Sequence, residues 1–298
     1  MEIIYDVSGI SRQSHSNYQK RRKEDQDDEL MVTNSIIAVR ELHPCMGLRK
    51  IYELLLSENV GRDNFIDIGV ENGFCLPKPK NYQRTTYSSK FRKYKNLTIG
   101  LRINGINIVW VSDITYIYIN GRFYYITFVV DVYSRRILGF EASETLQAES
   151  SCRALKMALQ ERRGLSLQGL IHHSDRGSQY ISNEYTGILN KHGIGISMCD
   201  SVYENTHIER VNGIIKNEYL LSYKMDSLKD LRKMTKQAVD LYNNMRPHWS
   251  LFKMNPVIYE ESLLQIPMNK REVMYIWSEG ELKNDTIYNQ EELFENYL

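Results

Sequence analysis

The stretch that decides the fold runs from Ile171 to Tyr180 and reads I-H-H-S-D-R-G-S-Q-Y. Apolar residues lead into a single carboxylate, Asp175, and Gly177 then breaks the run, which is typical of a buried strand that ends in a tight turn. An acid at the tip of such a strand is a candidate metal ligand. An isolated Asp-x-Gly more often only caps a turn, so Asp175 by itself leaves both interpretations open.

Two further acids lie in matching settings and favour a metal site. Asp113 falls within a β-rich run, W-V-S-D-I-T-Y, and Glu209 falls in a predicted helix within Y-E-N-T-H-I-E-R-V-N-G. Mg²⁺ and Mn²⁺ are hard ions that prefer oxygen ligands, and a pair of them can activate a nucleophile and balance charge on a phosphodiester. The three acids therefore predict metal-assisted phosphoryl chemistry, with Asp113, Asp175 and Glu209 as catalytic and metal-binding residues.

Four ordered motifs give the chain a resemblance to a known family. They are W-x-x-D-I-T-Y, H-S-D-R-G-S-Q-Y, N-x-x-x-E-R-V-N-G with a following K-x-E-Y, and Y-N-x-x-R-P-H-x-S-L. Over about residues 36–256 the chain resembles the OrfB transposases of the insertion-sequence three family, which are relatives of retroviral integrases. One departure is Y-E-N-T before Glu209, where the family usually has Y-D-N-A.

The resemblance implies DNA strand transfer on a ribonuclease-H-like integrase core. Water would free a 3′-OH at the element end, and that hydroxyl would attack a second phosphodiester. The role hypothesis has Asp113 bridging two ions, Asp175 holding one and Glu209 the other. An inactive or host-adopted DNA-binding protein of this fold is the main alternative, although it would be expected to lose an acid and all three are present. Two further alternatives are a ribonuclease-H-like or junction nuclease and a metal hydrolase that acts on small phosphates.

Composition and charge place the chain among ordinary globular proteins. Of 298 residues, 42% are hydrophobic and 25% charged, which argues against disorder. Net charge is only +1, but residues 76–102 carry eight Lys or Arg and no acid, whereas residues 271–298 carry seven acids against two bases. Four scattered cysteines suit neither a zinc site nor a disulfide framework, so a reducing cytoplasm is expected. No run approaches the roughly 18 apolar residues of a membrane span, so neither membrane insertion nor export is indicated.

Periodicity predicts the elements in chain order. Three helices are expected first, from Leu30 to before Pro44, over 48–56 and over 62–70. They could form a helix-turn-helix unit or a plain helical bundle, and the resemblance favours the helix-turn-helix unit. Three strands follow between Ile106 and Phe140, with Asn120-Gly121 as a hairpin turn. A helix over 146–163, a strand over 170–173, a helix over 183–191, a strand over 194–198 and helices from 205, over 227–245 and over 256–264 complete the pattern.

This order predicts the fold class and the domains. An antiparallel meander followed by parallel strands and helices indicates an α/β, ribonuclease-H-like integrase core: a mixed five-stranded sheet flanked by helices, with a small N-terminal helical region. The expected domains are a helix-turn-helix-like region over 1–75, a basic linker over 76–103, the catalytic core with C-terminal helices over 104–265, and an acidic tail of unassigned role over 266–298.

The basic linker is the first candidate for DNA contact. Its bases alternate with tyrosines, and because Lys and Arg neutralise phosphates while Tyr stacks on exposed bases, DNA contact is favoured over a plain linker. The predicted DNA-binding residues are Lys90, Arg92, Lys93 and Lys95, together with Lys216, which follows Glu209 by seven residues and so shares its helix face. The resemblance adds element ends and target DNA as partners, a homo-oligomer on DNA, and an upstream-frame protein that recognises the ends.

Five other residues have open roles. His172 and His173 are candidate ligands, but neighbours on a strand face opposite sides, and one is expected to pack in the core. Asp131 is either a fourth acid near the site or, as favoured, a turn residue. Arg246 and His248 belong to the last motif and are expected to pack onto the core or to contact DNA.

Overall fold

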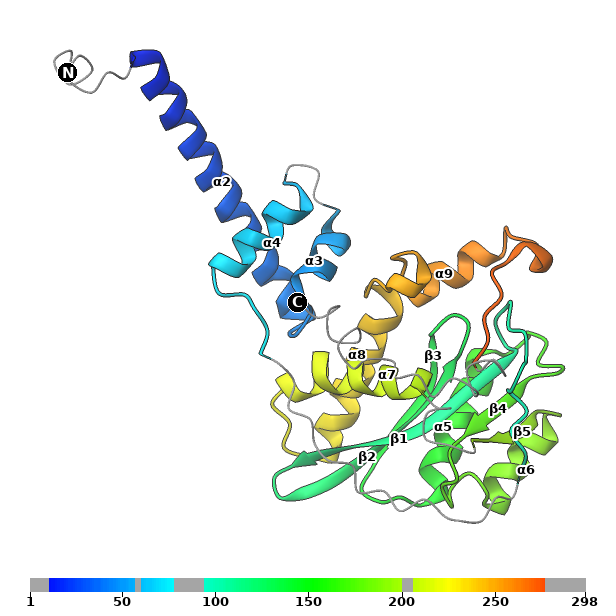
Figure 1. The fold of residues 1–298 in the computed structure, drawn as a ribbon. Coiled ribbons are helices and arrows are strands. Elements are labelled where there is room, and N and C mark those ends of the chain that lie inside the picture. The colour runs from blue at the N-terminus through cyan, green and yellow to red at the C-terminus, as the bar shows by residue number, and fades with distance from the viewer. Residues whose placement is uncertain (1–10, 57–59, 78–93, 200–205, 277–298) are drawn as a thin grey trace, which may run out of the picture. The chain divides into compact units, whose positions relative to one another are not determined.

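The computed structural model describes residues 11–56, 60–77, 94–199 and 206–276 (Figure 1). The chain divides into two compact units, residues 1–78 and 79–298. Across the described ranges, no helix has both the length and the apolar character that crossing a membrane requires.

The first unit is the predicted helical region. It consists of α2 (Arg12–Leu42), α3 (Leu48–Leu55) and α4 (Arg62–Glu71). Their apolar faces meet in a small core of their own, which includes Ile36, Ile51 and Phe65. A DNA-reading role for this unit stays a prediction.

Helix α2 begins well before the predicted start at Leu30. Ser11 is its N-cap, and the Ser11 side chain accepts a hydrogen bond from the Ser14 amide. Residues 12–29 are almost all exposed and are rich in Lys, Arg, Glu and Gln, which are good helix formers. Because this part of the helix has no apolar stripe, hydrophobic periodicity could not reveal it.

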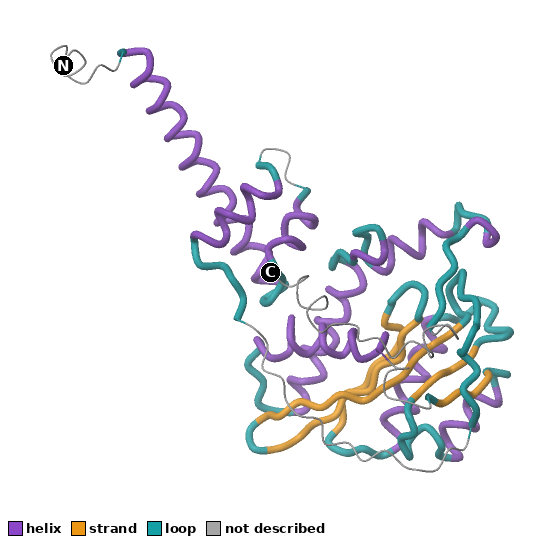
Figure 2. The backbone as a smooth tube through the Cα atoms, in the orientation of Figure 1, coloured by secondary structure: helices purple, strands orange, loops and turns teal. Residues whose placement is uncertain are grey.

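The second unit is built on one mixed sheet (Figure 2). Its strands are β1 (Val109–Ile119), β2 (Arg122–Asp131), β3 (Ile137–Ser143), β4 (Ile171–Ser174) and β5 (Gly195–Met198). The spatial order is β3-β2-β1-β4-β5, with β3, β2 and β1 antiparallel and β1, β4 and β5 parallel. The predicted five-stranded sheet and its hairpin at Asn120-Gly121 are confirmed.

Helices cover both faces of this sheet. They are α5 (Ala148–Glu161), α6 (Asn183–Lys191), α7 (Thr206–Ile214), α8 (Leu228–Asn244) and α9 (Pro256–Leu263). Alternate residues of β1 enter different cores: Val109 and Val111 pack with α7 and α8, whereas Trp110 packs with α5 and α6. At Gly139 of β3, an added Cβ would lie only 2.0 Å from the Ala154 carbonyl oxygen, so the approach of α5 requires glycine there.

Two segments outside the predicted core pack against it. The Leu97 amide donates to Ser197 Oγ at 2.8 Å, beside edge strand β5. Ile103 and Met274 exchange two backbone hydrogen bonds of 2.9 and 2.8 Å, so the first residues of the predicted tail return to the core. The predicted linker therefore packs on the core from residue 94 onward, and residues 78–93 lie outside the described residues.

Candidate active site

The strand register sets the first two predicted acids on neighbouring segments. In the parallel pair of β1 and β4, Ser112 is opposite Ser174, so Asp113 and Asp175 each directly follow one member of this pair, on segments that leave strands about 4.8 Å apart. Asp113 is buried, with 8% of its surface exposed. Asp175 follows the last residue of β4, and its Oδ1 accepts a hydrogen bond of 2.9 Å from the Gly177 amide. The strand-and-turn pattern around Asp175 is thus present as predicted.

Helix α7 lies along β1 on the same side as Asp113. Asn212 Nδ2 donates to Asp113 Oδ2 at 2.9 Å, and Lys216 Nζ lies 4.4 Å from the centroid of the Tyr116 ring, farther along β1. Glu209 is in the first turn of α7 and precedes Asn212 by three residues, so the two side chains share a helix face. The hydrogen bond from Asn212 therefore brings the helix that carries Glu209 to the strand that carries Asp113.

Asp113 and Asp175 come from neighbouring segments of the sheet, and the helix that carries Glu209 contacts β1 through Asn212. Among the described residues, no three His, Cys, Asp or Glu side chains form a group that could hold a metal ion. The donor types nevertheless fit Mg²⁺ or Mn²⁺, because carboxylate oxygens come from two adjacent strands and from a helix tied to one of them. Assignment of these acids as metal ligands stays a prediction.

A buried tyrosine lies close to both strand acids. The Tyr180 hydroxyl is 3.1 Å from Ser112 Oγ, which in turn donates to the Phe128 carbonyl oxygen at 2.8 Å. Burial, and next the negative charge of Asp175, with a smaller effect of Asp113, raises the pKa of Tyr180 well above its ordinary value. The phenol therefore stays neutral beside the two carboxylates. Sequence analysis did not single it out, although it closes the H-S-D-R-G-S-Q-Y motif.

Lys216 lies in a wider helical segment that follows α7. After Ile214 the helix becomes π-helical over Ile215–Tyr219, so the seven-residue spacing from Glu209 does not by itself guarantee a shared face. The ammonium group of Lys216 lies over the Tyr116 ring, and burial lowers the pKa of Lys216. A DNA contact from Lys216 stays a prediction.

Most of the other predicted DNA-binding residues cannot be located. Lys90, Arg92 and Lys93 lie outside the described residues. Lys95 is described: its side chain is exposed, and its carbonyl oxygen accepts a hydrogen bond of 3.4 Å from the Met198 amide. Lys95 therefore lies next to β5, on the edge of the sheet.

Both histidines of β4 are buried. The His172 ring Nε2 is 2.9 Å from the Tyr185 hydroxyl, and burial lowers the pKa of His172 to about 3. The His173 ring Nδ1 is 2.8 Å from Ser197 Oγ. Core packing was expected of only one of them, whereas the structure buries both, because each side of β4 is covered.

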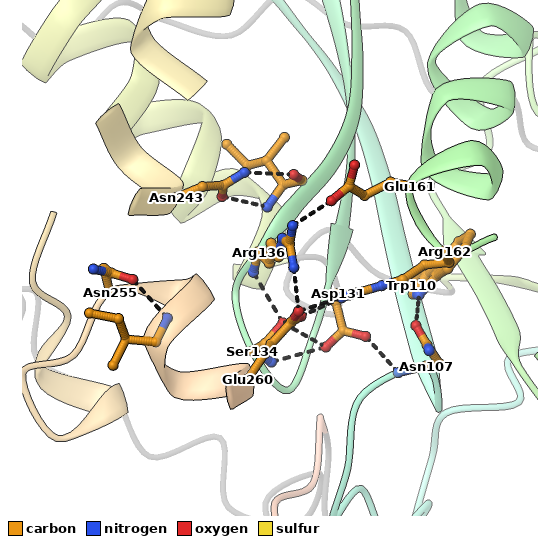
Figure 3. A network of polar contacts seen from close by, with 12 residues as sticks. Asn107, Trp110, Asp131, Ser134, Arg136, Glu161, Arg162, Asn243, Asn255 and Glu260 are labelled. Atoms are coloured by element: carbon orange, nitrogen blue, oxygen red, sulfur yellow. Dashed lines mark hydrogen bonds and ion pairs between the residues drawn. The ribbon is translucent and has the colours of Figure 1, made fainter. Parts of the chain in front are cut away.

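Asp131 is a turn residue, as favoured, and not part of the acid group (Figure 3). Its Oδ1 accepts from the amides of Tyr133 and Ser134 at 3.0 and 2.9 Å, and its Oδ2 accepts from the Asn107 amide at 2.7 Å. Burial, and next the Glu260 carboxylate, raises the pKa of Asp131. Its role is to fix the β2–β3 turn.

Next to that turn, a buried ion-pair network fastens α9 to the core (Figure 3). Glu260 on α9 accepts hydrogen bonds of 2.8 Å from Arg162 and 2.7 Å from Arg136. Ser134 Oγ also donates to Glu260, at 2.7 Å. The partners are up to 126 residues apart in the chain, so no local pattern could indicate this network.

The last motif packs onto the core. Arg246 makes a two-fold hydrogen-bonded ion pair with Glu218, in which both contacts measure 2.7 Å. Its guanidinium lies 5.8 Å from the Tyr242 ring centroid, and the His248 ring packs edge-on against the same tyrosine at 4.7 Å. Of the two roles expected for Arg246 and His248, packing is the one that the structure displays.

Comparison with known proteins matches this architecture. Two models described as integrase core domain match residues 104–203 and residues 194–256. An uncharacterised 31 kDa protein of insertion element IS600 from Shigella sonnei is 29% identical over 275 residues, which cover 87% of this chain and 98% of that protein. Transposase InsF of insertion sequence IS3A from Escherichia coli K12 is 30% identical over 164 residues, 54% of this chain and 56% of that protein.

A further relative is similar over a shorter stretch, and two solved structures have lower sequence identity. The putative transposase of IS986/IS6110 from Mycobacterium tuberculosis (strain CDC 1551 / Oshkosh) is 36% identical over 146 residues, which span 47% of this chain and 52% of that protein. The HTLV-2 integrase catalytic core, in complex with magnesium, is 22% identical over 48% of this chain and 89% of that one, with a TM-score of 0.37. The catalytic core of BIV integrase is 18% identical over 52% of this chain and 95% of that one, with a TM-score of 0.41.

The sheet order and the matched core models define the class: this is an integrase-type catalytic core of the ribonuclease-H-like fold. With the relatives named above, the chain belongs to the insertion-sequence three family of transposases.

Proposed function

We propose that this chain cuts DNA at the ends of an insertion sequence and joins the freed 3′ ends to target DNA in a metal-dependent reaction. One observation carries the proposal most directly. In the register of β1 and β4, Asp113 and Asp175 each directly follow one member of the same residue pair, and the Asn212 hydrogen bond brings the helix of Glu209 to β1. Paired carboxylates on adjacent strands, with a third on a docked helix, suit phosphoryl transfer on a nucleic acid.

Asp113, Asp175 and Glu209 would hold the two Mg²⁺ or Mn²⁺ ions. Bound ions of this kind lower the pKa of water and balance charge on phosphate oxygens. The protein's own contribution is orientation: Asn212 fixes one oxygen of Asp113, and the Gly177 amide fixes one oxygen of Asp175. No covalent enzyme intermediate is needed, because water and then a DNA 3′-OH are the nucleophiles.

The partners follow from the reaction. They are element-end DNA, target DNA and a second copy of the chain, because joining two ends requires two active sites held together. A protein encoded in an upstream frame would recognise the element ends. The reaction would take place in the cytoplasm. Lys90, Arg92, Lys93, Lys95 and Lys216 would contact DNA phosphates.

Three substrates separate the proposed function from its rivals. The full chain would be incubated with element-end duplex, with an RNA–DNA hybrid and with a nucleotide, in Mg²⁺ and in EDTA. We expect 3′ cleavage and joined products from the duplex, in Mg²⁺ only. Cutting of the hybrid alone would indicate a ribonuclease H, and DNA binding without any cutting would indicate a binding protein. A covalent protein–DNA product would refute the metal mechanism, because it requires a Tyr or Ser nucleophile.

Asn212→Ala should reduce cleavage by about 10- to 100-fold, the usual cost of losing a group that orients a metal ligand. The variant leaves Asp113 in place but removes its hydrogen bond, so raised Mg²⁺ should restore part of the activity. Asn190→Ala, an exposed amide on α6, is the matched control. An Asn212→Ala enzyme with an unchanged Mg²⁺ dependence would show that Asn212 does not position a metal ligand.

Phosphate contacts from the basic segment should dominate DNA affinity. If about five are made, log K should fall with log salt at a slope near −4.5. Changing Lys90, Arg92, Lys93 and Lys95 to Gln should flatten that slope to about −1, with the fold unchanged. The control removes three exposed lysines of α8 instead: Lys229, Lys233 and Lys236. An unaltered slope in the four-residue variant would show that the basic segment is only a linker.

A further inference from the structure

The β1–β2 hairpin extends beyond the rest of the sheet (Figure 1). Strand β4 pairs with β1 only over residues 109–112, and β3 pairs with β2 only over 125–130, so residues 117–124 form a two-stranded ribbon. Asn120 and Gly121 both have positive φ, 48° and 82°, as tight hairpin turns require. Asn120 Nδ2 also donates to Asp226 Oδ1 at 3.2 Å, which ties the tip to the loop before α8.

Three aromatic rings gather on this ribbon and at its base and are called here the hairpin aromatic surface: Tyr116, Tyr118 and Phe123. Tyr118 is 61% exposed and Phe123 is 52% exposed. The Phe123 ring centroid lies 4.9 Å from that of Tyr118 and 5.6 Å from that of Tyr116. The rings thus support one another and leave much of their surface open to solvent.

Positive charge borders this surface. Lys216 Nζ lies 4.4 Å from the Tyr116 ring centroid. Residues 114–124 read I-T-Y-I-Y-I-N-G-R-F-Y, so the only charge within the hairpin sequence is the cation Arg122. Aromatic rings interleaved with cations are the composition of surfaces that bind single-stranded nucleic acid, because bases stack on the rings and phosphates pair with the cations.

We infer that the hairpin aromatic surface stacks on unpaired DNA bases next to the phosphodiester that is cut. The inference rests on the proposed function and names a further binding site for the same substrate. Tyr116 follows Asp113 by three residues on β1, which is a rise of about 10 Å but directs the two side chains to opposite faces of the strand. Lys216 spans this difference, because it continues the helix that contacts Asp113 through Asn212 and reaches the Tyr116 ring. A DNA strand held at Asp113 therefore reaches the hairpin by crossing the edge of β1 that β4 leaves unpaired beyond Ser112. Duplex bases are stacked on each other and offer no open face, so the occupant is single-stranded.

Binding of an unstructured single-stranded oligonucleotide to the full chain, in EDTA, tests this inference. Tyr118→Ala and Phe123→Ala should each weaken binding by about tenfold, the usual scale for losing one stacked base. Duplex binding should not change. Phe252→Ala, which removes a phenylalanine that is 59% exposed after α8, is the matched control and should bind like the unchanged chain. Phe123→Trp should keep the affinity and add an indole emission that single-stranded DNA quenches.

Several outcomes would overturn the inference. They are equal single-strand affinity in Phe123→Ala and in the unchanged chain, a loss as large in Phe252→Ala, or no quenching of Phe123→Trp. A shift to a smaller oligomer in Phe123→Ala, with single-strand affinity intact, would assign the surface to a second copy of the chain. Asp113→Asn should retain single-strand binding, because the assay contains no metal. Failure of cleavage by the unchanged chain would therefore count against the proposed function alone.

Discussion

Glu209→Gln is expected to reduce Mg²⁺-dependent cleavage and joining by at least about 10³-fold, the scale of losing a main electrostatic contribution to a transition state. The substitution keeps the side-chain shape but removes the charge that would hold a cation. Because Glu209 is in the first turn of α7 and is only partly buried, folding and DNA affinity should change little. Thermal unfolding and binding in EDTA check both points.

The chain offers a matched control for this experiment. Glu149 occupies the first turn of α5, as Glu209 occupies the first turn of α7, so Glu149→Gln changes the same charge at the same helical position. It should leave cleavage unchanged. Asp200 lies outside the described residues and is the competing candidate for the third ligand. If Glu209→Gln stays active, or if Asp200→Asn is equally damaging with the fold intact, Glu209 is not the third ligand.

Glu218→Gln is expected to cost about 3–5 kcal/mol of the free energy of unfolding, because it leaves the buried Arg246 cation without its counter-charge. Both side chains are buried, and their two contacts of 2.7 Å join the π-helical segment to the end of α8. Urea unfolding measures the loss. The buried ion pair makes this position structural.

A double substitution separates the ion pair from a general packing defect. Glu218→Leu with Arg246→Met removes both charges and fills similar volume, so it should be more stable than Glu218→Gln, since replacing a whole buried pair is often nearly neutral. A double variant as unstable as the single one would show that shape, rather than an uncompensated charge, causes the loss.

Glu209→Gln and Glu218→Gln are expected to affect different properties, although both residues lie in one continuous helical element. Glu209 at its start is expected to affect chemistry without stability, and Glu218 at its end to affect stability first. The change of helix type between them explains the division. The sequence predicts one helix from Asn205 onward, and the regular α-helical spacing no longer applies from Ile215, where the helix becomes π-helical.

The sequence by itself determined the sheet and its helices, because alternation and helical spacing report which side of each element is buried, and burial patterns are local. It also predicted the acids of the candidate site, since Asp113 and Asp175 each stand in a strand context that can be recognised along the chain. Only the tertiary structure decided which distant residues meet: Asn212 contacts Asp113, the Tyr180 hydroxyl contacts Ser112, and Met274 pairs with Ile103. Those contacts depend on how distant elements are set against one another, a relation that periodicity within any one element does not contain.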